Sequence, residues 1–211
     1  MSLITENSPQ HCAKKQELIS ERFIKRLFFC MSTIFLVLIS ITLLVWLIIR
    51  PTKPRFSIKE AQINQLKITT PSSLNSSIHI TLASTNPNDK LGIHYDEFVV
   101  YASYKGERIS PEASVTPFYV DHGETKPLSA LLVGNHQPVS PFLAYQLERD
   151  QEIGKLEMEF NVVGKLRWRV GNWVSKRTRF TVHCIMVVRF GSMNSPPLST
   201  STQGTVCSFS Y

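Results

Sequence analysis

The sequence lacks the short motifs on which many catalytic and cofactor sites are built. It contains no Gly-x-Ser-x-Gly elbow, no His-Glu-x-x-His helix, no phosphate-binding loop and no dinucleotide-binding fingerprint. The six histidines are scattered. His183 stands beside Cys184 on an expected strand, where successive side chains point to opposite faces, and this argues against a nucleophile and base pair. We therefore predict that the protein is not an enzyme, with no catalytic residues and no cofactor.

A basic tract is missing from most of the chain, although the formal net charge is +7. Beyond residue 50 the Lys and Arg residues are interspersed with Asp and Glu, so we expect no nucleic-acid partner. Five cations do gather just before a long apolar run, where a membrane surface explains them. They are Lys14, Lys15, Arg22, Lys25 and Arg26.

Charged residues, proline and glycine are absent from residues 27–49, where Leu, Ile, Val and Phe dominate. As a helix this run is about 34 Å long, enough to cross a hydrocarbon core of about 30 Å. Trp46 lies near one end, where an indole ring favours the membrane interface. The alternative is a cleaved secretory signal, but its apolar region is shorter and it needs small residues at the cleavage site. We predict an uncleaved transmembrane helix over 27–49, with the lipid bilayer as its partner.

The flanks of this run leave its orientation less clearly set. Cations on the far side, such as Arg50 and Lys53, nearly match those on the near side, and long domains translocate largely regardless of charge. We expect residues 1–26 to form a cytosolic basic tail and residues 50–211 to lie outside. The triplet that begins at Asn75 is an acceptor for N-glycosylation, in a polar stretch that we expect to be a loop.

The four cysteines never occur as a close pair, so no zinc site or other metal site is expected. In an oxidising compartment Cys184 and Cys207 can form a disulfide, closing a loop of about twenty residues with a stabilisation of roughly 3 kcal/mol. The alternative is two separate thiols, with Cys184 buried. Cys30 lies near the start of the apolar run and is a candidate for S-acylation, or else a packing or lipid-facing thiol. Cys12 belongs to the tail.

After Pro54 the continuous apolar run gives way to alternation, which is typical of strands with one face toward a core. Apolar residues take every second position in three stretches: Phe56 and Ile58; Ile78, Ile80 and Leu82; Leu156, Met158, Phe160 and Val162. Further expected strands are 98–104, 115–120, 128–133, 180–190 and, after a polar loop beyond Gly191, a short one at 205–209. Turn residues separate them at 86–89, 105–107, 121–123 and 171–172.

One short helix interrupts the strands. Ser140 can cap it, Pro141 suits its first position, and Phe142, Leu143 and Leu147 form an apolar stripe. Seven or eight strands with one such helix predict an all-β domain, a β-sandwich of immunoglobulin or fibronectin III-like build, preceded by the single transmembrane helix.

Residues 86–96, Asn-Pro-Asn-Asp-Lys-Leu-Gly-Ile-His-Tyr-Asp, carry a resemblance to a known family. Further blocks lie at 104–106, 117–119, 164–171 and 182–184. In this order, and after a single helix, they resemble plant proteins related to the harpin-induced and non-race-specific disease resistance proteins. The outer domain of that family is of the late-embryogenesis-abundant group 2, or LEA-14-like, type. The start of the domain and residues 192–204 depart from the family pattern.

The strongest block also has a physical interpretation. Pro87 fixes its own φ and pushes Asn86 toward extended geometry, while asparagine side chains such as that of Asn88 hydrogen-bond nearby backbone in turns. We predict a structural turn here, ahead of a binding loop. Trp168 and Trp173 are interpreted as packing residues ahead of a ligand platform.

The resemblance implies a plant plasma-membrane protein, associated with defence, the hypersensitive response and abiotic stress, in a family not known for enzymes. Our first hypothesis is signalling through protein interactions at the cell surface, with a membrane or cell-wall protein as partner; self-association stays open. The alternative is a lipid-handling domain that holds an acyl chain in a cleft between its sheets. Large apolar residues are compatible with that cleft, or with an ordinary filled core: Phe98, Phe118, Phe142 and Phe160.

Overall fold

The structure, a computed structural model, describes residues 10–49, 51–70, 72–189 and 205–211. The chain divides into two compact units, Met1–Arg50 and Pro51–Tyr211, and each is held together by contacts within itself. The first unit contributes one helix, and the second contributes two β-sheets and a second helix.

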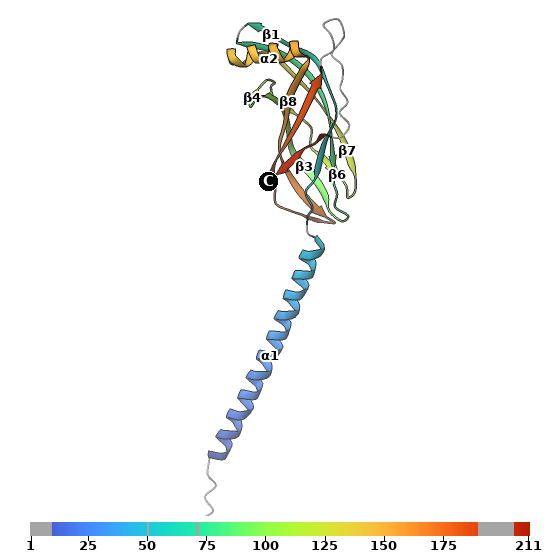
Figure 1. The fold of residues 1–211 in the computed structure, drawn as a ribbon. Coiled ribbons are helices and arrows are strands. Elements are labelled where there is room, and N and C mark those ends of the chain that lie inside the picture. Colours follow the sequence, from blue (N-terminus) through green and yellow to red (C-terminus); the bar gives the residue numbers. More distant parts are fainter. Residues whose placement is uncertain (1–9, 50, 71, 190–204) are drawn as a thin grey trace, which may run out of the picture. The chain divides into compact units, whose positions relative to one another are not determined.

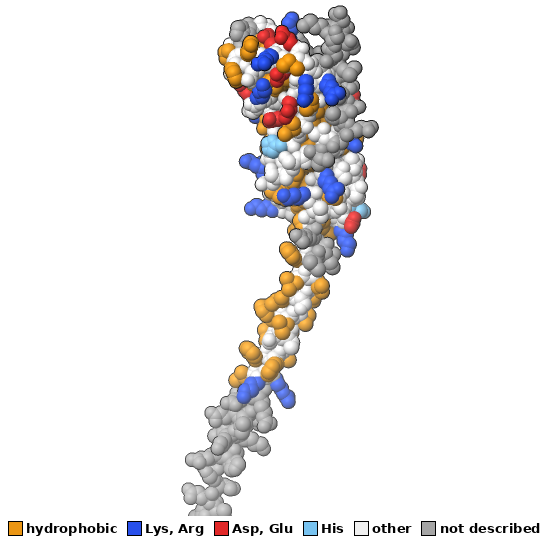
Figure 2. All heavy atoms as spheres, viewed as in Figure 1, with side chains coloured by type: hydrophobic (Ala, Val, Ile, Leu, Met, Phe, Trp, Pro, Cys, Tyr) orange, Lys and Arg blue, Asp and Glu red, His pale blue; other side chains and the backbone are white. Residues whose placement is uncertain are grey.

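Helix α1 runs over Gln10–Ile49 and so begins before the expected apolar run. Within it, Phe23–Trp46 is long and apolar enough to cross a membrane, judged by length and composition. Hydrophobic side chains follow the described part of α1 on the face in view (Figure 2). Three hydroxyls in this stretch donate to carbonyls of their own helix: Thr33 Oγ1 to Cys30 at 2.9 Å, Ser40 Oγ to Leu36 at 2.9 Å and Thr42 Oγ1 to Ile39 at 2.8 Å. This is how polar side chains avoid unpaired donors in an apolar medium.

The second unit is an antiparallel β-sandwich, which confirms the predicted all-β class (Figure 1). Sheet A has the strand order β11-β1-β2-β7, and sheet B has the order β12-β10-β8-β3-β4, with β5 and β6 also paired to β3 and β9 paired to β8. The strands of sheet A are β1 Arg55–Thr70, β2 Ser73–Thr85, β7 Thr125–Pro138 and β11 Thr205–Val206. The long strands of sheet B are β3 Gly92–Tyr104, β8 Lys155–Val170 and β10 Thr178–Arg189, and the short ones are β4 Glu107–Arg108, β5 Ala113–Ser114, β6 Phe118–Val120, β9 Trp173–Val174 and β12 Ser208–Ser210.

Aromatic rings fill the space between the two sheets. Phe56 of β1 lies 6.1 Å from Phe98 of β3 and 6.2 Å from Phe180 of β10, measured between ring centroids. Tyr95 stacks on Phe118 at 4.6 Å, and its hydroxyl is 3.0 Å from the Ser84 hydroxyl. Burial raises the pKa of Tyr95 far above its ordinary value, against the smaller lowering effect of the Ser84 hydrogen bond. Because this unit has a hydrophobic core of its own, we expect it to fold without α1.

Strands β1 and β3 are longer than the alternation predicts, because register shifts interrupt the alternation inside each of them. In β1 the buried side chains are Phe56 and Ile58, and then, after a shift between Ile58 and Glu60, Ala61 and Ile63. Each shift changes the phase of the alternation by one residue, so a period-2 pattern is lost at that point. A shift between Tyr95 and Glu97 interrupts the alternation in β3 in the same way, so the alternation does not predict the first part of this strand.

The expected strand at 115–120 is wrong as a single element. β5 ends at Ser114 and β6 begins at Phe118. Pro117 between them has no N–H to donate to a neighbouring strand, and the Val115 N–H bonds to the Phe98 carbonyl at 2.8 Å.

The prediction that the Asn75 triplet lies in a loop is also wrong, because it lies in β2. Leu74 and Ser76 are buried, with 0% and 2% of their surface exposed, and they alternate with the half-buried Asn75 and Ser77. Serine and asparagine thus keep the strand period although the stretch is polar.

The expected strand 205–209 is split between the two sheets. Thr205 pairs with β1 in sheet A, whereas Phe209 pairs with β10 in sheet B, and the chain crosses between them at Cys207. The expected loop beyond Gly191 lies outside the described residues up to residue 204.

Helix α2 spans Pro141–Ile153, with Ser140 Oγ accepting the Leu143 N–H at 3.2 Å. Its buried residues are Leu143, Ala144 and Leu147. Phe142, expected in the apolar stripe, is 70% exposed. At 100° per residue, Phe142 lies on the opposite side of the helix from the centre of the buried set, so it is neither a core nor a cleft residue.

Candidate functional site

The family block forms a turn between β2 and β3, built around the buried side chain of Asn86. Its Nδ2 donates to the Leu91 carbonyl at 2.6 Å and to the Asp121 carbonyl at 3.1 Å. Its Oδ1 accepts the backbone N–H of Asn88 at 3.1 Å. With no exposed surface, Asn86 depends on these partners, because an unpaired buried amide is costly.

Asn88 ties the same turn to the residues at which the chain enters the unit. Its Oδ1 accepts the Thr52 N–H at 2.7 Å, and its Nδ2 donates to the Thr52 carbonyl at 2.9 Å. The same Nδ2 lies 2.8 Å from Oδ1 of Asn86. One side chain therefore holds both backbone groups of Thr52, in the manner of a neighbouring strand.

The loop between β6 and β7 closes over this turn. The Asn86 N–H donates to the Glu124 carbonyl at 2.9 Å, and the Gly123 N–H donates to the Asn88 carbonyl at 3.0 Å. Gly123 has a φ of 67°, which glycine adopts at little cost. Residues 52, 86–88 and 121–124 form what we call the chain-entry turn. The side chains of its two asparagines hydrogen-bond to the backbone of the domain itself, so the chain-entry turn is a structural feature.

Asp121 and His122 lie on the surface of the chain-entry turn. The backbone N–H of His122 donates to Asp121 Oδ1 at 2.8 Å, and its ring Nδ1 lies 2.7 Å from the same oxygen. These two hydrogen bonds, the backbone one first, hold the pKa of Asp121 below its ordinary value. Both side chains are exposed, so this pair adds little stability.

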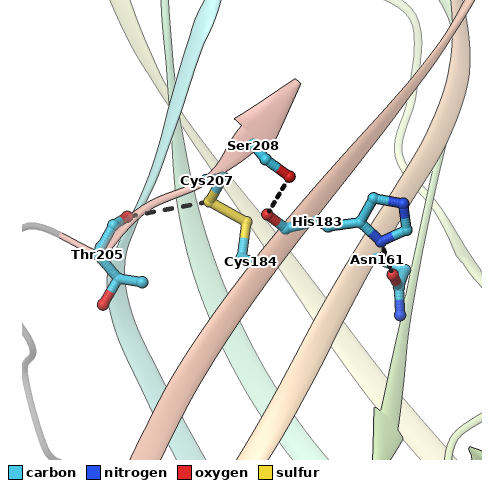
Figure 3. The surroundings of a disulfide bond; sticks show 6 residues. All are labelled: Asn161, His183, Cys184, Thr205, Cys207 and Ser208. Atoms are coloured by element: carbon cyan, nitrogen blue, oxygen red, sulfur yellow. Dashed lines mark hydrogen bonds between the residues drawn. A yellow bond between two sulfur atoms is a disulfide. The ribbon is translucent and has the colours of Figure 1, made fainter. Parts of the chain in front are cut away.

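Cys184 and Cys207 form a disulfide in the structure (Figure 3). Their Cα atoms are 4.4 Å apart and 23 positions separate them in the sequence. Cys184 is buried in β10, and the Cys207 N–H donates to the Phe56 carbonyl of β1 at 3.1 Å. The bond thus lies where the chain passes from sheet A to sheet B and fixes that crossing.

His183 points away from the disulfide, on the opposite face of β10 (Figure 3). Its Nδ1 lies 2.5 Å from Asn161 Oδ1, and Asn161 Nδ2 donates to Ser103 Oγ at 2.7 Å. This polar line crosses β10, β8 and β3, and local sequence patterns cannot predict it because its members are far apart in the chain. It supplies no arrangement of nucleophile and base, since an asparagine stands between the hydroxyl and the imidazole.

The remaining predicted site residues are apart from one another. Cys30 is an exposed free thiol on α1. Asn75 lies on β2, where its Oδ1 accepts the His136 N–H at 2.8 Å. Trp168 is buried and Trp173 is 58% exposed. Among the described residues no three His, Cys, Asp or Glu side chains come together as metal ligands.

Comparison with known proteins matches residues 81–185 to the family model described as late embryogenesis abundant protein. NDR1/HIN1-like protein 26 of Arabidopsis thaliana is 48% identical over 211 residues, covering 99% of this chain and 99% of the relative. The chain belongs to the NDR1/HIN1-like family of late-embryogenesis-abundant proteins. The family resemblance of residues 86–96 is thereby confirmed.

Other NDR1/HIN1-like proteins of Arabidopsis thaliana are also similar. Protein 1 is 31% identical, over 81% of this chain and 83% of the relative, and protein 12 is 35% identical, over 71% and 72%. A solution structure of another Arabidopsis thaliana protein shares 13% identity and a TM-score of 0.37, over 69% of this chain and 87% of that one. A crystal structure of an Archaeoglobus fulgidus protein shares 15% identity and a TM-score of 0.30, over 63% and 98%.

Within this NDR1/HIN1-like chain, the matched family region contains the whole Asn86–Asn88 block and Cys184 but ends before Cys207. The disulfide therefore joins a residue inside the family region to one outside it.

Proposed function

We propose that this protein is a membrane-anchored, non-enzymatic plant protein that acts in defence, including the hypersensitive response, and in stress signalling, through protein interactions at the cell surface. The observation that carries the proposal is family membership, with 48% identity to NDR1/HIN1-like protein 26 along nearly the full chain. Its partner is another membrane protein or a cell-wall protein, and the plasma membrane is its site.

The proposed topology places the tail in the cytosol and the β-sandwich outside. The candidate span Phe23–Trp46 supports anchoring, and the Cys184–Cys207 disulfide supports an oxidising surrounding for the sandwich, because such bonds are rare in the cytosol. Asn75 is half-buried, and no described residue bonds to its Nδ2, the atom that a glycan would modify.

An interaction role fits the chemistry of the described residues better than catalysis does. The polar groups of the chain-entry turn are directed to the domain's own backbone, and the line from Ser103 to His183 passes through an amide. These arrangements give a rigid scaffold that holds surfaces in place.

The lipid-handling alternative receives less support. The space between the sheets around Phe98 and Phe118 is occupied by rings 5.3 to 6.1 Å apart, and Phe142 lies on the surface. Two hollows that described residues line, one near Arg167 and one near Lys165, open on the outer face of sheet B. An acyl chain between the sheets would have to displace several packed rings.

Protease protection on intact plant protoplasts tests the topology. The full chain carries one tag at each end, and external protease is added before and after detergent. We expect the C-terminal tag to be lost without detergent and the N-terminal tag only with it. A C-terminal tag that survives until detergent is added would overturn the proposed topology.

Proximity labelling tests the interaction role. A labelling enzyme is fused to the C-terminus of the full chain, and the matched control carries the same fusion on α1 alone. We expect membrane or wall proteins enriched with the full chain over the control, and two differently tagged copies report self-association. Identical labelling by both fusions would show that the sandwich contributes no partner.

A further inference from the structure

A hollow of about 350 Å³ lies on the outer face of sheet B, apart from the chain-entry turn and the disulfide. It is lined by His94, Arg167, Arg169, Asn172 and Val174. Two arginines, an imidazole and an amide therefore surround one small volume, with a single apolar residue beside them.

The strand pattern explains why these side chains meet. In β8, Leu166 and Trp168 point into the core, so Arg167 and Arg169 project from the opposite face. Across the sheet, His94 of β3 is the register partner of Arg167, and Val174 of β9 is the register partner of Arg169. Opposite positions in an antiparallel pair are near neighbours, which brings four of the five lining residues together. The fifth, Asn172, lies in the turn that joins β8 to β9.

One carboxylate serves three basic side chains at this hollow. Asp96 forms an ion pair with Arg167, lies 3.1 Å from Arg177 Nε, and lies 3.4 Å from His94 Nε2. Burial alone would raise the pKa of Asp96, but the hydrogen bond and charge of Arg167, followed by the electrostatic interactions with Arg177 and His94, hold this pKa below its ordinary value. Asp96 alone cannot neutralise Arg167, Arg177 and Arg169 together, so these arginines give the hollow more positive charge than Asp96 offsets.

The two arginines are held in place before any ligand binds. Arg167 is anchored by Asp96, and its buried Nε has no hydrogen-bond partner among the described residues. Arg169 donates from Nε to the Gly171 carbonyl at 3.1 Å, and its guanidinium lies 5.9 Å from the centre of the Tyr119 ring. Fixed arginines lose little conformational freedom on binding, which favours recognition of an anion.

The second hollow on sheet B, of about 210 Å³, shows the contrast. It is lined by acidic as well as basic side chains, and these pair with each other: Lys165 with Glu97 at 2.8 Å and Arg108 with Glu112 at 2.8 Å. Carboxylates of the protein pair with Lys165 and Arg108 in this second hollow, so it offers less uncompensated positive charge to bind an anion. Arg179, which lines only this second hollow, is a useful reference position.

We propose that the hollow around Arg167 and Arg169 is a binding site for a phosphate group, supplied by the headgroup of a phospholipid. Guanidinium groups bind phosphate through paired N–H donors, and donors from β3, from β8 and from the turn after β8 suit a tetrahedral anion with several oxygens better than a planar carboxylate. The volume also leaves room for the glycerol side of a headgroup beside Val174.

The hairpin between β8 and β9 favours a lipid as the source. Trp173 is 58% exposed and Val174 is 44% exposed, and alternation directs them to opposite sides of β9. Exposed tryptophan beside arginine is typical of a surface that enters a membrane interface. The choice of a lipid rests on the anchoring in the proposed function, because an anchored domain meets headgroups at high local concentration. The phosphate site itself does not rest on it.

Vesicle binding by the purified 51–211 unit, with its disulfide intact, tests the proposal. The vesicles are phosphatidylcholine alone, or equimolar phosphatidylcholine and phosphatidic acid, and co-sedimentation measures binding. In parallel, inorganic phosphate is titrated in a calorimeter. We expect binding to the phosphatidic acid vesicles, with competition by phosphate.

Three variants give the test its specificity, and circular dichroism checks the fold of each. Arg169→Gln should weaken both phosphate and vesicle binding by about tenfold. Arg179→Gln removes the same charge from the same face outside the hollow, and should change binding little. Trp173→Ala should weaken vesicle binding but leave the phosphate titration unchanged.

Each other outcome overturns a stated part of the proposal. Equal losses in Arg169→Gln and Arg179→Gln would replace the site with diffuse charge attraction. Phosphate binding without vesicle binding would reject the phospholipid as the source, as would a Trp173→Ala variant that binds vesicles normally. Binding of neither probe would remove the site, while the topology and partner experiments of the proposed function would stand unaffected.

Discussion

Asn88 holds Thr52 by both of its backbone groups, accepting the N–H at 2.7 Å and donating to the carbonyl at 2.9 Å. Thr52 is the second residue of the sandwich unit, which begins at Pro51. The asparagine of a turn between β2 and β3 thus secures the first residues of a unit whose first strand starts only at Arg55. This relationship assigns the second asparagine of the family block a definite structural task.

Replacing Asn88 by alanine should destabilise the 51–211 unit by about 2 to 3 kcal/mol, because two backbone groups of Thr52 and Oδ1 of Asn86 lose their partner. Urea unfolding followed by fluorescence measures the change. Asn172→Ala, at an exposed turn position, is the matched control and should change stability by less than about 0.5 kcal/mol. Equal stabilities of Asn88→Ala and the unaltered unit would contradict the assigned role.

The disulfide should stabilise the unit by about 3 kcal/mol, the loop-closure value for cysteines 23 positions apart. Unfolding with and without dithiothreitol measures this difference. The double variant Cys184→Ala with Cys207→Ala should be less stable and indifferent to the reductant. A reductant effect of the same size in the double variant would assign the stabilisation to something else.

Asn75 should carry a glycan when the full chain is made in plant cells. Peptide N-glycosidase treatment should then shift the protein on a gel, and both Asn75→Gln and Ser77→Ala should remove the shift. Ser76→Ala keeps the acceptor triplet and serves as the control. No shift in the unaltered chain would mean either a cytosolic sandwich or a site that the strand β2 hides, and the protease experiment separates these.

Gly164 should tolerate alanine badly. A Cβ there would lie 2.2 Å from the Glu97 carbonyl oxygen and 2.8 Å from the Phe180 ring, so the strands would have to move. We expect a loss of about 3 kcal/mol or more. Gly171→Ala, where a φ of 53° is the only obstacle, should cost about 1 kcal/mol. Thermal unfolding ranks the two, and a reversed order would contradict the close approach at Gly164.

Asp96→Asn should lower stability at pH 7 by about 1 to 3 kcal/mol, because Arg167 loses its ionic partner. The pKa of Asp96 is lower in the folded chain than its ordinary value, so its contribution is present above about pH 3.9 and is lost as the pH falls through the folded pKa. The gap between the variant and the unaltered unit should therefore narrow below about pH 4, as measured by urea unfolding at several pH values. Asp89→Asn, at an exposed position, is the control. A gap independent of pH would exclude the carboxylate as its cause.

The sequence was sufficient for the fold class because alternation survives in β2, β8 and β10. It failed where the backbone departs from strict alternation. The register shift at Tyr95 and Glu97 moves the core side from odd to even positions, so strict alternation predicts only the part of β3 from Phe98 onward. Polar side chains inside a strand, such as Asn75 and Ser76, predict a loop for the opposite reason, since their polar composition outweighs their periodicity.

For the sites too, local sequence preferences predict some features, whereas contacts between residues far apart in the chain could not be predicted. The turn at Asn86 was identifiable because proline and asparagine have local preferences, but its partners Thr52 and Asp121 lie 36 and 35 positions from Asn88 and Asn86, beyond the reach of local rules. The hollow at Arg169 was missed because its residues come from β3, β8 and β9 and meet only through strand register. The alternation of Arg167 and Arg169 with Leu166 and Trp168 was the one available signal.

The crossing of the chain from sheet A to sheet B at Cys207 has a consequence for how cleavage of this protein is detected. A backbone cut anywhere between Cys184 and Cys207 leaves two fragments joined through sulfur. When the cut lies between β10 and β11, the small C-terminal fragment still supplies β11 to one sheet and β12 to the other. Such a nicked molecule would run at full length on a non-reducing gel and separate into two bands only once the sulfur link is reduced.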